Sequence, residues 1–486
     1  MWLGSARAGA FGILRGSHIP CRTFTARALA AAPQVPSPYR NFSWSRCHAA
    51  RLPLGSRPVK EGTPEVEKLS EASKEQPDAK EPGLTFYETV ARPGVARQIL
   101  WFLGFSAFAF PTAAWLTEQS TNRWVDTVRY TSHWGPMDNN LLRAREQTAL
   151  VERLRAIHRT IYKGLSAFPS TVRANVSHIY VAIFQPIADA SQPKKIAWSL
   201  CFAMGAVFMM QNIPRLQPFM RRNFVHSALS GMSITLLTST FAHAGFIHFA
   251  VNMLAFEGFS SSTVVYLAKA QDREQRHGIF EASPFWHFLA FFCVAGAFSS
   301  LAHHVIQVKV TYPRLVRQYA NALARQAAAA ASAVGRTKTW ADAVRPSHRV
   351  RRRWIPRLRG AIRPGATEVE VLQDRLKRAL LPSVGASGAI YACLVVTALA
   401  FPHAEVALFF PPGMSMNIQT GVLGAIAMDI AGVIFGWSYL AHWAHLGGAL
   451  FGYLYYNYGP ALWADLRRVV HEEAAKEEGG PVKRLF

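Results

Sequence analysis

The sequence predicts an all-α, polytopic membrane protein, and three features of its composition support this prediction. Half of its 486 residues are hydrophobic and only 17% are charged, whereas soluble domains average about a quarter charged residues. The apolar residues gather in blocks instead of recurring with the period of an amphipathic helix. Each block, at about 1.5 Å per helical residue, can cross most of a hydrocarbon layer about 30 Å thick.

Seven apolar blocks are candidate membrane spans, and the fold expected from them is a helical bundle. The first block contains Pro111, which a membrane helix tolerates when its neighbours satisfy the freed backbone groups. The first helix is expected within residues 96–118, and the other six form a core at 195–460. The apolar blocks lie at about 99–116, 196–213, 245–267, 285–308, 387–401, 418–437 and 439–458.

The first 60 residues have the composition of a mitochondrial presequence. They contain eight arginines and one lysine but no aspartate or glutamate, and serine, alanine and glycine are abundant. A disordered basic tail is the alternative. The charge then reverses, since seven acids lie between Glu61 and Glu81. We therefore expect a solvated linker at residues 61–95.

Two long polar segments separate the predicted spans. Residues 119–194 are expected to form a soluble loop, within which residues 141–165 have apolar side chains at helical spacing. Residues 309–380 form a basic insertion with 17 Lys or Arg and four acids. This balance is typical of a solvated loop that obeys the positive-inside rule, and contact with anionic headgroups is the alternative. A polar tail is expected at residues 461–486.

The basic insertion also sets the expected topology. If it faces the mitochondrial matrix, four spans before it place the N-terminus in the matrix, and three spans after it place the C-terminus in the intermembrane space. The net charge of +24 would also suit a nucleic-acid ligand. No nucleic-acid-binding motif accompanies that charge, so we expect no nucleic-acid partner.

A serine at the start of the fifth predicted span is the candidate nucleophile. Ser387 lies between Gly385 and Gly388, and glycines allow a substrate or a neighbouring helix to approach closely. A helix N-terminus also offers unpaired backbone N–H groups, which suit a developing oxyanion. The pattern alone is weak, because serine among small residues is common wherever membrane helices touch.

A histidine in the last predicted span supplies the missing base. His445 is followed by Gly448 and Gly452, a G-x-x-x-G face that allows another helix to pack closely. That contact would bring the His445 imidazole to Ser387, where it could take the serine proton and later return it to a leaving amine. His442, one turn earlier, is the alternative base.

Three further side chains are expected to support this pair. Tyr391 lies four residues after Ser387 on the same helix face, and its ring is expected to lie against the imidazole. His248 and Asn252 lie one turn apart at the start of the third predicted span. Together with the Ser387 backbone N–H they would form an oxyanion hole, and interhelical hydrogen bonding is the structural alternative.

No carboxylate is obviously placed in the sequence to orient His445, so a Ser–His dyad is expected in preference to a triad. Asp429 lies within the sixth predicted span and needs some partner there, such as a histidine. The five cysteines are far apart and include no C-x-x-C. No disulfide framework or zinc site is therefore expected.

Taken together, these residues resemble the rhomboid family of intramembrane serine proteases, and most of all its mitochondrial presenilin-associated branch. The resemblance covers about residues 197–459 without the basic insertion, which departs from the usual compact core. It lies in His248-x-x-x-Asn252, Gly385-Ala386-Ser387-Gly388, Tyr391 and Ala444-His445-x-x-Gly448-x-x-x-Gly452.

The resemblance implies a function and a location. By resemblance Ser387 is the nucleophile, His445 the base, and His248 and Asn252 the oxyanion donors, with Gly385 and Tyr391 in support. The family uses neither metal nor cofactor, and this branch has one extra span before a six-helix core. Its members lie in the mitochondrial inner membrane. They contact membrane lipid and process transmembrane substrates such as dynamin-like GTPases.

The expected function is therefore that of a multi-pass inner-membrane serine endopeptidase that cleaves transmembrane segments. The topology above would open its site toward the matrix. A catalytically inactive rhomboid-like protein that only binds transmembrane helices is the first alternative. A transporter is the second, although such proteins often show two repeated halves that this sequence lacks.

Overall fold

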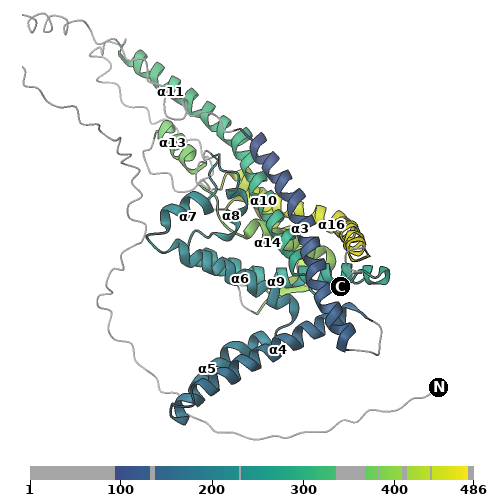
Figure 1. The fold of residues 1–486 in the computed structure, drawn as a ribbon. Helices are drawn as coiled ribbons and strands as arrows, with labels where there is room; N and C mark the ends of the chain where they lie inside the picture. Colours follow the sequence, from purple (N-terminus) through teal and green to yellow (C-terminus); the bar gives the residue numbers. More distant parts are fainter. Residues whose placement is uncertain are drawn as a thin grey trace, which may run out of the picture. The chain divides into compact units, whose positions relative to one another are not determined.

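The chain is an all-α membrane protein, and the residues that the structure describes are helical apart from connecting segments and one pair of short antiparallel strands (Figure 1). The computed structural model describes residues 94–131, 137–228, 231–334, 367–379, 382–407, 413–437 and 440–479. The predicted presequence at 1–60 and all but the last two residues of the predicted linker at 61–95 lie outside these residues.

A helix occupies each of the seven predicted spans. Among the described residues, three helices also have the length and hydropathy of a span, at Ala96–Arg129, Phe285–Ser332 and Ile418–Phe435, while Ser387–Ala400 is apolar but shorter. The helical fold is confirmed, and the count of one span plus six stays a prediction. The seven helices are α3 (Ala96–Thr131), α6 (Gln192–Gln211), α9 (Phe246–Gln271), α10 (Phe285–Ile306), α14 (Ser387–Ala400), α15 (Ile418–Phe435) and α16 (His442–Gly479).

Shorter elements connect these helices. The helix expected at 141–165 is α4, which packs antiparallel against α5. The basic insertion begins as a continuation of α10 through one π-helical turn, η4, into α11, which packs against α13. The connecting elements are α4 (Asn139–Gly164), α5 (Ser170–Asp189), α7 (Gln217–Phe224), α8 (Thr235–Thr238), η2 (Ser239–Phe241), η3 (Glu274–His277), η4 (Gln307–Thr311), α11 (Tyr312–Val334) and α13 (Glu368–Ala379).

Helix α14 lies at the centre of the bundle, in contact with α9, α10, α15 and α16. It can do so because it contains four alanines and Gly388, small residues that allow neighbouring backbones to approach. Large side chains from the surrounding helices fill the core around it. The fully buried ones include Met204 of α6, Phe256 of α9, and Phe288, Phe291 and Phe292 of α10.

Local sequence sets the position of α15. Antiparallel strands β1 (Glu405–Ala407) and β2 (Ser415–Asn417) precede it. The Asn417 side chain then accepts a hydrogen bond from the Gln419 N–H at 2.9 Å, which caps the helix N-terminus. At the other end Gly436 adopts a left-handed conformation, with φ of 69°. These two ends fix the register of α15 and leave Asp429 inside the helix, fully buried.

Helix α16 extends beyond the end expected from the sequence. The predicted span ends near residue 458, with a polar tail from 461, but α16 passes through Pro460 and continues to Gly479. Trp463 and Arg467 on this extension are buried, and an Arg467 guanidinium N–H donates to Glu118 of α3 at 2.8 Å. The first part of the expected tail is therefore a packed helix that ties α16 to α3.

Candidate active site

A strained turn presents Ser387 at the start of α14. Gly385 has a φ of 131°, a conformation that side chains with a Cβ rarely adopt, and its N–H donates to the Ser239 carbonyl at 2.9 Å. A Cβ at this position would lie 2.8 Å from Cε1 of His248. Glycine is therefore required at position 385 both by the backbone conformation and by the nearness of the His248 ring. The turn makes Ser387 the first helical residue, where backbone N–H groups have no intrahelical acceptor.

Ser387 and His445 meet where α14 and α16 cross. A Cβ on Gly448 would fall against the backbone carbonyl of Gly388, and a Cβ on Gly452 would lie 2.5 Å from the Ala392 carbonyl oxygen. The backbones of the two helices are therefore in contact, as the G-x-x-x-G pattern predicts. His445 Nε2 lies 2.9 Å from Ser387 Oγ, which is hydrogen-bond distance.

A carboxylate lies behind this histidine. His445 Nδ1 is 3.1 Å and 3.2 Å from the two carboxylate oxygens of Asp429, and both residues are buried. An ionised carboxylate only accepts hydrogen bonds, so the imidazole proton belongs on Nδ1 and the Nε2 lone pair faces the Ser387 hydroxyl. The geometry is that of a three-residue chain and differs from the dyad expected from the sequence.

Asp429 also binds a second histidine. His442 Nδ1 lies 2.6 Å from Asp429 Oδ1, and its ring rests on Gly432, where any Cβ would overlap it. His442 is thus directed to the aspartate, while His445 contacts both the aspartate and Ser387. This arrangement selects His445 over His442 as the side chain that can accept the serine proton.

The ring of Tyr391 stacks on His445, as expected from their places on the two helices. The ring centroids are 4.5 Å apart and the planes differ by 12°. This flat contact restricts rotation of the imidazole about its χ2 angle. Together with the bonds to Asp429, it holds the ring in the orientation that keeps Nε2 facing the serine.

His248 lies against the Gly385 turn from the first turn of α9, and Asn252 follows one turn later on the same helix. His248 Nδ1 accepts a hydrogen bond from the Ala244 N–H at 3.3 Å, so the neutral ring carries its proton on Nε2. That nitrogen faces Gly385, beside the serine. Asn252 Nδ2 donates to the His248 carbonyl at 2.7 Å, which leaves one amide N–H for another acceptor.

Sequence reasoning placed Ser387, His445 and Tyr391 together but did not assign the carboxylate. The signal for it was present, because Asp429 is the only acid between residues 418 and 435, and a buried acid in a span needs a partner. For Ser299 of α10, no pattern in the sequence indicated a role. Its hydroxyl donates to the Ala444 carbonyl at 2.6 Å and so fixes the first turn of α16 beside Gly388.

Comparison with known proteins finds a domain similar to the segment that holds this site. Residues 365–459 match the Rhomboid domain, and this range contains Ser387, Asp429 and His445. The match excludes α9, where His248 and Asn252 lie. No solved structure matches the chain.

Curated relatives cover a larger part of the chain. Mitochondrial presenilin-associated rhomboid-like proteins match over 60% of it in Mus musculus, at 26% identity, and over 61% in Homo sapiens, at 27% identity. The mitochondrial Rhomboid protein 1 of Saccharomyces cerevisiae matches 54% of the chain at 25% identity. The matched segment spans about half the length of these relatives, at 56%, 56% and 53%.

Proposed function

We propose that this chain, which carries a rhomboid domain and is related to mitochondrial presenilin-associated rhomboid-like proteins, is an intramembrane serine endopeptidase. The observation that carries the proposal is the hydrogen-bonded series Ser387–His445–Asp429, held between apolar helices. A serine that only packs between two helices would have no use for an aligned imidazole and a buried carboxylate behind it. Rhomboid proteins are generally serine proteases of this kind, which agrees with the geometry.

The residues would act in a fixed order. His445 Nε2 removes the Ser387 hydroxyl proton as Oγ attacks the scissile carbonyl, and Asp429 stabilises the imidazolium that forms. The Ser387 backbone N–H and the His248 Nε2–H then donate to the oxyanion. His445 returns the proton to the departing amine. A water molecule, deprotonated by the same imidazole, hydrolyses the acyl enzyme and regenerates Ser387.

Water must reach a site of this kind from outside the membrane. A cavity of about 300 Å³ lies between α6, α7 and the segment before α9, and its walls include Val384 and Gly245. Val384 directly precedes the Gly385 turn, so the cavity reaches the segment that leads to Ser387. We assign it the role of a water path. The side of the membrane to which it opens follows from the topology, for which the matrix is the expectation from the basic insertion.

The substrates would be transmembrane proteins of the mitochondrial inner membrane, whose helices enter from the lipid and unwind near Ser387. The mitochondrial relatives and the Arg-rich first 60 residues support a mitochondrial location, and the inner membrane is what the family resemblance implies. Dynamin-like GTPases are the substrate class that the family resemblance suggests. An inactive rhomboid-like protein that binds helices without cutting them is the competing function.

The test is cleavage of a reporter transmembrane segment by purified protein in detergent and in vesicles. Ser387→Ala should abolish cleavage and also labelling by a fluorophosphonate, which forms a covalent bond to an activated serine with loss of fluoride. Ser262→Ala is the matched control, because Ser262 Oγ bonds only to its own helix at Gly258. Equal cleavage by wild type and Ser387→Ala excludes Ser387 as nucleophile. Reporter binding without cleavage or labelling by the wild type supports the inactive helix binder.

A further inference from the structure

The hairpin formed by α4 and α5 carries unbalanced positive charge. Its outer part, residues 153–188, contains five Lys or Arg and not one Asp or Glu. Four of these cations are exposed and the fifth, Arg173, is half-buried. The exposed four are Arg153, Arg155, Arg159 and Lys163.

Specific contacts hold the two helices together and define the inner face of the hairpin. His158 Nε2 lies 2.7 Å from Ser177 Oγ, and the Tyr180 hydroxyl donates to the Leu154 carbonyl at 2.9 Å. The ring of Tyr180 also packs on His158, with centroids 5.1 Å apart. These contacts fix how each helix is rotated, and therefore which side chains face outward.

One outward side of the hairpin is apolar. On α5, apolar residues follow one another at intervals of four, three and four, which is a single helical face, and the Ile179 side chain on it is 57% exposed. On α4, two isoleucines one turn apart are also exposed. At about 100° per residue, both stripes lie to the same side of the plane through the two antiparallel helices. The stripes consist of Val172, Val176, Ile179 and Ile183 on α5, and Ile157 and Ile161 on α4.

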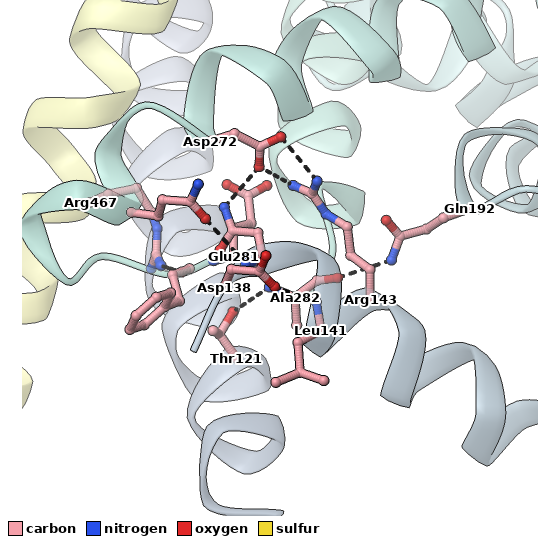
Figure 2. A network of polar contacts seen from close by, with 12 residues as sticks. Thr121, Asp138, Leu141, Arg143, Gln192, Asp272, Glu281, Ala282 and Arg467 are labelled. Atoms are coloured by element: carbon pink, nitrogen blue, oxygen red, sulfur yellow. Dashed lines mark hydrogen bonds and ion pairs between the residues drawn. The ribbon is translucent and has the colours of Figure 1, made fainter. Parts of the chain in front are cut away.

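Polar contacts attach the base of the hairpin to the connection between α9 and α10 (Figure 2). Arg143 forms two hydrogen bonds with the Asp272 carboxylate, at 2.8 Å and 3.2 Å, and Gln192 Nε2 donates to the Ala282 carbonyl at 3.0 Å. The Glu281 N–H donates to the Asn139 side chain at 2.8 Å. This connection joins the ends of two predicted spans, so the hairpin is anchored at the level of a membrane surface.

We propose that the α4–α5 hairpin lies on an anionic lipid bilayer, with its apolar side in the boundary between headgroups and acyl chains. An exposed apolar helix face, with arginines on the opposite polar face and no acid among residues 153–188, is the pattern of an interfacial helix. Arg153 lies beside the apolar stripe, and the long arginine side chains can extend along the helices to phosphate groups. A second copy of the chain is a poorer occupant, because two such basic surfaces would repel each other.

The proposal is tested on the full chain reconstituted in vesicles, with its five native cysteines replaced and one new cysteine carrying an environment-sensitive fluorophore. Ile179→Cys reports on the apolar side. Ala174→Cys is the matched control, since it is exposed on the same helix about 140° away. We expect brominated lipids to quench the label at 179 at least about threefold more than the label at 174. Equal quenching at both sites overturns the proposal, and so does a shielded label at 179 that lipid does not quench, which indicates a protein partner.

A second comparison tests the part played by charge. The triple variant Arg153→Gln, Arg155→Gln and Arg159→Gln should reduce lipid quenching at 179 in vesicles that contain phosphatidylglycerol. It should have little effect in pure phosphatidylcholine, where the surface has no net charge. The same loss in both lipids, or no loss in either, overturns the assignment to anionic lipid.

Discussion

Replacing one glycine tests whether the contact between α14 and α16 positions the active site. A Cβ at Gly448 would lie 2.8 Å from the Gly388 carbonyl carbon, and ordinary contacts begin at 3.4 Å. The carbon contact alone requires the backbones to separate by 3.4 − 2.8 = 0.6 Å, and the Gly388 carbonyl oxygen, which lies still nearer to the added Cβ, requires more, so 0.6 Å is a lower bound. If His445 moves with α16, its distance of 2.9 Å to Ser387 Oγ becomes 2.9 + 0.6 = 3.5 Å, beyond the range of a sound hydrogen bond.

The expected loss for Gly448→Ala is large in activity and smaller in stability. A displacement near 1 Å can cost about 100-fold in rate, and overpacking costs about 1–3 kcal/mol of folding free energy. Cleavage of a reporter span gives kcat/KM, and thermal unfolding in the same detergent gives the stability. The matched control is Gly424→Ala in α15, where a Cβ meets nothing within 4 Å. Normal kcat/KM in Gly448→Ala would refute the idea that this close approach aligns His445.

Three further variants are expected to separate the roles of individual groups. Asp429→Asn keeps the shape but removes the charge behind His445, so single-turnover cleavage should slow by about 10²–10⁴-fold with the fold intact. Gly385→Ala places a Cβ at a φ of 131° and 2.8 Å from the His248 ring, so it should abolish cleavage, whereas Gly258→Ala, where a Cβ meets nothing within 4 Å, should not. Burial raises the pKa of Glu281 from 4.5 to about 7, so folding stability should fall between those pH values by about 3 kcal/mol, as measured by thermal unfolding across pH.

The sign of the Glu281 effect follows from proton binding. Between pH 4.5 and 7 the folded state keeps the proton that the unfolded state has lost, so raising the pH favours unfolding. Glu281→Gln, an uncharged isostere, should flatten this part of the curve and be the more stable protein at pH 8. A wild-type curve that is already flat contradicts the raised pKa.

For Asp429→Asn, a near-normal rate would mean that Ser387 and His445 suffice as a dyad.

The sequence was informative about helices and about pairs that share a helix face. Apolar blocks predicted a helix at each of the seven expected spans because a span must satisfy its backbone hydrogen bonds internally. Tyr391 could be placed beside the imidazole because its spacing from Ser387 is fixed by the helical turn. The G-x-x-x-G pattern at Gly448 predicted a close helix contact, and that contact fixed the partner of His445.

The sequence was less informative where packing between distant segments decides the outcome. Asp429 is 13 and 16 residues from the two histidines it contacts, and its direction depends on how α15 is rotated against α16. Helical periodicity alone does not give that rotation. The extension of α16 past residue 458 was missed for a related reason, because Arg467 is buried against partners far away in the sequence, among them Glu118 on α3, 349 residues earlier.

The geometry also explains how the segment that resembles the Rhomboid domain accommodates a long basic insertion shortly before Ser387. The insertion separates α10 from α14 along the chain, yet Ser299 of α10 still bonds to Ala444 of α16, beside Gly388. The Gly385 N–H is likewise held by Ser239, which precedes the insertion. The turn and both catalytic helices are therefore fixed by contacts that do not involve residues 309–380, and changes in the insertion should leave the Ser387–His445 distance unaltered.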